Sequence, residues 1–98
     1  MIIAFSVAPT EVPNAHAEMS EAVAAAVRVV RESGLPHETN AMFTLVEGEW
    51  EEVMDVVKRA TDAVLAVSPR VSLVLKADIR PGYHNQLTQK VESLERHL

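Results

Sequence analysis

The chain lacks cysteine and has few glycine or aromatic residues, and these shortages exclude several classes of function. Without cysteine its 98 residues can form no disulfide, no thiolate nucleophile and no thiolate metal site. The three glycines, Gly34, Gly48 and Gly82, lie too far apart to form a glycine-rich phosphate-binding loop. The apolar start, MIIAFSVAP, is too short to span a bilayer and lacks a basic leader, so we expect a cytoplasmic protein.

The charge balance is acidic and argues against nucleic acid or anionic membranes as partners. Nine lysines and arginines face 14 aspartates and glutamates, which gives a formal net charge of -5. No basic run offsets this charge, so phosphate groups would be repelled. The hydrophobic fraction of 48% is ordinary for a globular protein, and the length suits one core, so residues 1–98 are predicted to form a single domain.

Hydrophobic periodicity predicts four strands and three helices. Strands are expected over residues 2–8, 37–40, 42–47 and 70–80, and helices from Asn14 to Gly34, from Gly48 to Val67 and from Tyr83 to Leu98. The order β-α-β-β-α-β with a terminal helix is typical of the ferredoxin-like α+β fold. In that fold two helices cover one face of a four-stranded antiparallel sheet.

The other face of such a sheet is uncovered, and the last strand determines its character. Period two places Val74, Lys76, Asp78 and Arg80 on this face. The face could meet solvent or a second subunit. A sheet-to-sheet dimer would bury Val74 and would require partners for the charged residues, because unpaired buried charge is costly. We favour the dimer, with these four residues at the interface.

Two short motifs resemble those of a known family. Thr44, Glu47 and Gly48 in FTLVEGEWEEV, followed by KADIR in the last strand and by QKVESLE near the end, resemble the MTH1187/YkoF-like family of small thiamine-binding proteins. The similarity runs over nearly the whole chain in the same element order. It implies a ferredoxin-like fold, homodimers through the open sheet faces that often pair into homotetramers, and binding of thiamine or its hydroxymethylpyrimidine moiety without catalysis.

The resemblance also implies which residues contact the ligand. Thiamine carries an aminopyrimidine and a cationic thiazolium, and a pocket with a few placed polar groups suffices for both. Glu47 could pair with the amino group or a ring nitrogen, and Thr44 offers a hydroxyl. The predicted ligand residues are Glu47, Thr44, Asn40, Ser6, Ser20 and Phe43.

Structural roles stay open for these residues. Thr44 and Glu47 have the spacing of a capping box, which would make Glu47 the start of the second helix instead of a ligand residue. Asn40 is also typical of a turn, and the two serines are typical of solvated hydroxyl groups. The histidines at 16, 37, 84 and 97 match no zinc-site spacing, so no metal is predicted.

The sequence favours binding over catalysis. It has no nucleophile-elbow pattern and no compelling acid–base pair, so no enzymatic activity and no cofactor besides thiamine as a ligand are predicted. The expected role is storage, delivery or sensing of thiamine. Two alternatives stay open because the fold carries many functions: a protein–protein interaction module without a small-molecule ligand, and a small dimeric ferredoxin-like enzyme using Asp78 or a histidine.

Overall fold

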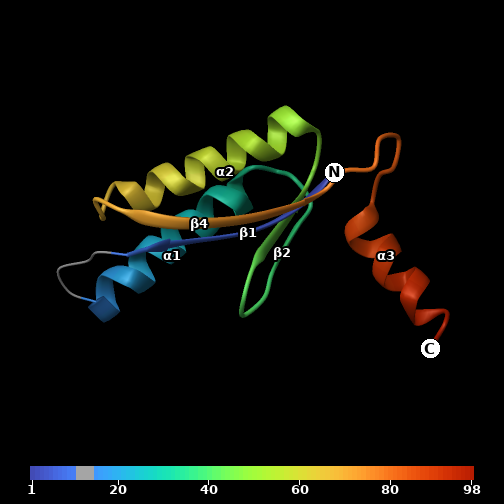
Figure 1. The fold of residues 1–98 in the computed structure, drawn as a ribbon, viewed down its shortest axis with the longest axis horizontal. Coiled ribbons are helices and arrows are strands. Elements are labelled where there is room, and N and C mark those ends of the chain that lie inside the picture. The colour runs from blue at the N-terminus through green and yellow to red at the C-terminus, as the bar shows by residue number, and fades with distance from the viewer. Residues whose placement is uncertain (11–14) are drawn as a thin grey trace.

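The predicted ferredoxin-like arrangement is confirmed. The computed structural model describes the backbone of residues 1–10 and 15–98, and the side chains of all of these except 15–19. The predicted helix cap at Asn14 lies outside the described residues. Along the chain (Figure 1) the elements are β1 (Ile2–Pro9), α1 (Ala15–Glu32), β2 (His37–Thr39), β3 (Thr44–Glu47), α2 (Trp50–Leu65), β4 (Val71–Asp78) and α3 (Gln86–Glu95).

The four strands form one antiparallel sheet in the order β2-β3-β1-β4. β1 pairs with β4 along its whole length, from Ile2 opposite Asp78 to Pro9 opposite Val71. Its pairing with β3 stops at Phe5, which lies opposite Thr44. One edge of β1 beyond Phe5 therefore has no neighbouring strand in the described part of the chain.

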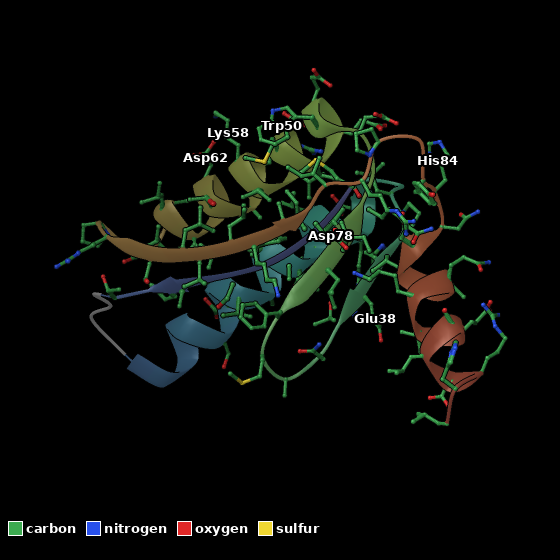
Figure 2. All side chains as sticks on the ribbon, turned by 45° about the vertical axis from the view of Figure 1, so that its right-hand side comes forward. Glu38, Trp50, Lys58, Asp62, Asp78 and His84 are labelled. Atoms are coloured by element: carbon green, nitrogen blue, oxygen red, sulfur yellow. The ribbon has the colours of Figure 1, made fainter. Side chains whose placement is uncertain are left out.

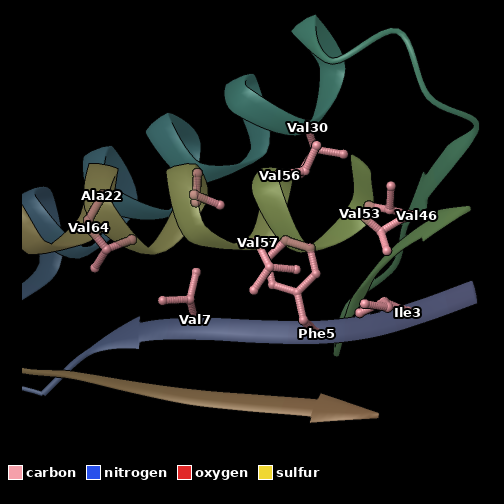
Figure 3. Packing of buried hydrophobic residues seen from close by; sticks show 12 residues of the cluster. Ile3, Phe5, Val7, Ala22, Val30, Val46, Val53, Val56, Val57 and Val64 are labelled. Atoms are coloured by element: carbon pink, nitrogen blue, oxygen red, sulfur yellow. The ribbon is translucent and has the colours of Figure 1, made fainter. Parts of the chain in front are cut away.

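The core lies between the sheet and the two long helices. β1 alternates between half-buried and buried residues, so one side of the strand faces the helices. The matching apolar stripes of α1 and α2 close over this face (Figure 3). The buried hydrophobic residues are Ile3, Phe5, Val7, Ala22, Ala26, Val30, Val46, Val53, Val56, Val57, Ala60 and Val64.

Both long helices have recognisable ends, one of them at a different residue from the predicted one. α1 stops just before Gly34, whose φ of 79° is the left-handed conformation expected of a C-terminal cap. At the start of α2, the backbone N–H of Glu49 donates to the Glu52 carboxylate over 3.0 Å. The interpretation of Glu47 as the start of the second helix is therefore wrong, because Glu47 belongs to β3.

The hairpin is shorter than the sequence predicts. Strand is expected from Met42 onward, but residues 40–43 form a loop. The side-chain oxygen of Asn40 accepts hydrogen bonds from the backbone N–H groups of Met42 and Phe43, each over 2.8 Å. Asn40 thus closes a turn, as its residue type predicts, and this turn keeps Met42 and Phe43 out of the strand.

The uncovered face of the sheet lies where the sequence predicts it, but β4 ends at Asp78, so the prediction that Arg80 belongs to this strand is wrong. Val74 pairs with Ser6 and is 54% exposed, while Lys76 pairs with Ala4 on the same face. The terminal helix α3 begins at Gln86 instead of Tyr83 and projects from the body of the molecule (Figure 1). It has no buried residue and leaves Val91, Leu94 and Leu98 exposed.

Candidate functional site

A hollow opens where β1 continues past the end of β3. Its volume is about 230 Å³, and we call it the hairpin hollow. Four of the six predicted ligand residues border it, namely Ser6, Asn40, Phe43 and Thr44. The remaining lining is Phe5, Val7 and Ala8 of β1, Val23, Ala26 and Val27 of α1, and Thr39, Ala41 and Met42 of the hairpin.

Apolar side chains from the core and from α1 therefore form most of this hollow, and the hairpin supplies its polar groups. Thr44 lies opposite Phe5 and shares its helix-covered face of the sheet, and the Thr44 hydroxyl has no hydrogen-bond partner among the described residues. Asn40 uses its side-chain oxygen in the turn, so its amide nitrogen is the donor left for another molecule. Ser6 alternates with Phe5 and Val7, which directs its side chain to the open face, so Ser6 borders the hollow by its backbone.

Glu47 lies on the opposite face of β3 from Thr44, because residues three apart on a strand point to opposite sides. Its side chain is only 6% exposed. One carboxylate oxygen accepts the backbone N–H of Gln86 over 2.8 Å, and the other accepts that of Leu87 over 3.2 Å. These N–H groups belong to the first turn of α3, where Asn85 makes no capping bond with its own side chain. Glu47 therefore caps α3 from a strand 39 residues earlier.

Two further contacts surround Glu47 in a smaller hollow of about 180 Å³. Asp78, labelled in Figure 2, lies at the end of β4. It accepts a hydrogen bond from Lys90 of α3. This hydrogen bond and the positive charge of Lys90 lower the pKa of Asp78. The guanidinium of Arg80 stacks on the Tyr83 ring at 3.5 Å from its centroid. Two of the three predicted interface charges, Asp78 and Arg80, thus have partners within the chain.

Ser20 lies apart from the other predicted ligand residues. It borders a shallow hollow of about 600 Å³ along the outer side of α1, together with Val23, Ala24, Val27, Arg28 and Arg31. Val23 and Val27 line both this surface and the hairpin hollow, so the two are adjacent. Arg28 and Arg31 are not among the predicted site residues, although their spacing of three on a predicted helix places them on one face.

The described residues limit which other sites are present. Among the side chains of residues 1–10 and 20–98, no group of three or more histidine, aspartate or glutamate residues is arranged to hold a metal ion. No described helix has the length and apolar character needed to cross a membrane. The hairpin hollow instead offers an amide donor, a hydroxyl and an aromatic side chain beside apolar groups, an arrangement suited to a small flat ring with polar edges.

Known proteins of similar sequence and structure point to one family. The family model described as thiamine-binding protein matches residues 3–95. A UPF0045 protein of Mycobacterium bovis is 52% identical over 99 residues, which cover 100% of this chain and 94% of the relative. Hypothetical protein MJ1052 of Methanocaldococcus jannaschii has a TM-score of 0.83 at 31% identity, covering 96% of this chain and 94% of that one. A Thermotoga maritima protein named for thiamine biosynthesis or salvage has a TM-score of 0.77 at 26% identity, covering 95% and 96%.

We predict that Glu47→Ala releases α3 while leaving the domain folded. Loss of a helix-capping side chain typically costs about 0.5–2 kcal/mol, and α3 has no buried residue to compensate. Amide hydrogen exchange should become faster in residues 86–95 and stay unchanged in β1 and α2. Glu38→Ala, which removes an exposed carboxylate, is the matched control. Unchanged exchange in α3 of the Glu47 variant would show that the carboxylate does not hold the helix.

We also predict that Asp78 titrates below the ordinary aspartate pKa of about 3.9, because Lys90 stabilises its charged form. Since the pKa is lower in the folded than in the unfolded state, this contact contributes fully at pH values above the unfolded pKa. The contribution disappears as the pH falls through the folded pKa. Carboxyl-carbon NMR titration measures the value directly, and Lys90→Met should return it toward the ordinary one. An identical titration curve in the variant contradicts the assigned cause.

Proposed function

The chain belongs to the thiamine-binding protein family, and from this premise we propose that it binds thiamine or its hydroxymethylpyrimidine moiety without catalysis. Storage, delivery or sensing of the vitamin is the role that such binding serves. The observation that carries the proposal is the hairpin hollow, because it gathers a hydroxyl, an amide donor and an aromatic side chain at one end of the sheet.

The size of the hollow favours the pyrimidine ring as the part that enters. Pockets for drug-sized ligands usually measure about 300–1,000 Å³, which exceeds the 230 Å³ of the hairpin hollow. One ring can occupy it, with Phe43 beside the ring and Thr44 and Asn40 at its polar edge. The remainder of thiamine then lies outside the hollow.

For Glu47 we propose an indirect role in binding. Both of its oxygens accept N–H groups of α3, and the residue is only 6% exposed, so little of the carboxylate is open to a ligand while α3 stays in place. Displacement of the first turn of α3 would free both oxygens for a direct contact with thiamine. Faster amide exchange of Gln86 and Leu87 on adding ligand would then favour the direct contact over the indirect role.

We further propose that two copies associate through their open sheet faces, as a homodimer or within a homotetramer. Val74 supplies exposed apolar surface on this face, and the apolar residues of α3 extend it. Asp78 already pairs with Lys90, and Arg80 stacks on Tyr83, so two of the predicted interface charges would enter the contact with partners. Such partners reduce the cost of burying charge. Lys76 remains as the charge that a second copy would have to accommodate.

Calorimetric titration tests the ligand. Thiamine and hydroxymethylpyrimidine should both release or absorb heat on binding, and Thr44→Val should weaken binding roughly 2- to 10-fold, the usual effect of losing one hydrogen bond. Asn40→Asp keeps the oxygen that closes the turn but removes the amide donor, so it should also weaken binding. Thr88→Val, on the exposed side of α3, is the control. Absence of heat with thiamine, the pyrimidine and thiamine diphosphate would exclude the proposed function.

Analytical ultracentrifugation tests the association. Val74→Lys places an additional charge at the centre of the proposed contact and should shift the population from dimer or tetramer to monomer. Val67→Lys changes a similarly exposed valine outside the open face, so the assembly should persist. A wild-type protein that sediments as a monomer, or a Val74 variant that assembles normally, contradicts the proposed interface.

A further inference from the structure

β1 has an unpaired backbone edge beside the hairpin hollow. In an antiparallel pair, each residue directs its N–H and C=O to the same neighbouring strand, and successive residues alternate between the two sides. Met1 and Gly48 exchange two hydrogen bonds, of 2.8 and 3.0 Å, so the odd-numbered residues of β1 direct these groups to β3. On the other side, the N–H of Thr10 donates to the carbonyl of Arg70 over 2.9 Å, which fits the same alternation.

Val7 is the next residue in this series, and β3 ends before reaching it. A continued register would place Met42 opposite Val7, since Phe5 lies opposite Thr44. The N–H of Met42 instead donates to the side-chain oxygen of Asn40. Among the described residues, therefore, no strand meets the N–H and C=O of Val7 on this side.

The position of Val7 makes this pair of groups a rigid feature of the hollow. Its side chain is 8% exposed and packs in the core, and both its neighbours in sequence are held by β4. Val7 also lines the hairpin hollow. A donor and an acceptor thus lie side by side at the wall of a small, largely apolar cavity, where an unpaired backbone group is costly and a matching partner is favoured.

We propose that the backbone of Val7 recognises the aminopyrimidine edge of the ligand. A ring nitrogen of the pyrimidine accepts the hydrogen bond from the Val7 N–H, and the neighbouring amino group donates to the Val7 carbonyl. The ring then occupies the place of the missing strand, as peptides do when they extend a sheet edge. This inference rests on the proposed function and specifies the ligand class: flat heterocycles with an amino donor beside a ring-nitrogen acceptor.

This pairing predicts a particular discrimination. In oxythiamine a keto oxygen replaces the amino group, and the adjacent ring nitrogen becomes a donor. The ring N–H of oxythiamine then faces the N–H of Val7, and its keto oxygen faces the carbonyl of Val7. Neither pair can form a hydrogen bond, and a site that leaves buried polar groups unpaired strongly rejects such an analogue. Oxythiamine should therefore bind at least about tenfold more weakly than thiamine. Thiamine and oxythiamine differ only at the pyrimidine edge, so the rest of the molecule does not contribute to the difference in their affinities.

Amide hydrogen exchange followed by NMR tests the contact at its own atom. In the free protein the Val7 amide should exchange much faster than those of Ile3 and Phe5, which are paired with β3, and of Ser6 and Ala8, which face β4. Saturating hydroxymethylpyrimidine should slow exchange at Val7 at least about tenfold and leave the other four amides unchanged. Val7 protected in the absence of ligand would overturn the proposal, because a protein group would already occupy its edge.

The calorimetry separates this inference from the proposed function. Heat of binding without slower exchange of the Val7 amide would overturn the backbone contact but leave thiamine binding intact. Equal affinities for thiamine and oxythiamine would lead to the same conclusion. Absence of heat with both thiamine and its pyrimidine would overturn the proposed function and the Val7 contact together. Asn40→Asp serves as a second variant, because it retains the side-chain oxygen that accepts the Met42 N–H. The Val7 amide should therefore still exchange fast in the ligand-free variant.

Discussion

The hydrogen bonds that the Asn40 side-chain oxygen accepts from its own loop determine where β3 begins, and the rest of the candidate site depends on that position. Because the N–H of Met42 donates to Asn40, residues 40–43 leave the sheet and β3 begins only at Thr44. β1 nevertheless stays extended, since β4 holds it from Ile2 to Pro9. Because β1 pairs with β4 as far as Pro9 but with β3 only as far as Phe5, both the hollow and the unpaired backbone edge lie between these two residues. A single turn therefore accounts for both features of the candidate site.

The short strand β3 also contributes side chains to both faces of the sheet. In its four residues, Thr44 and Val46 face the helices, while Leu45 and Glu47 face the other way. Thr44 thus borders the hairpin hollow, and Glu47 holds α3 on the open side. A change in the position of β3 would therefore act on the hollow and on α3 together. If the chain binds its ligand and associates as proposed, β3 is the short physical route between the two sites.

The sequence predicts the fold well because its signals are local. Alternation of Ile3, Phe5 and Val7 indicates a strand with one buried face, and Gly34 marks the end of the first helix. The site is harder to predict, because its contacts join residues far apart in the sequence or involve backbone groups that no residue type identifies. The partners of Glu47 lie 39 and 40 residues later, so Thr44 and Glu47 resemble a capping box in the sequence alone. The backbone edge at Val7 depends on where a neighbouring strand stops, and valine itself gives no indication of a polar contact.

The open face shows why polar residues on a strand do not exclude an interface. By sequence, KADIR is too polar for the core of a monomer, and in the structure Asp78 bonds to Lys90 while Arg80 covers the Tyr83 ring. These pairs lie at the end of β4 next to α3, whereas Val74 lies further along the strand. Paired charge still loses hydration when it is buried, so the charges are best accommodated at the rim of a contact whose centre is apolar. The pairing within the chain therefore determines which part of the face can be buried: the region around Val74, with the α3 end at its edge.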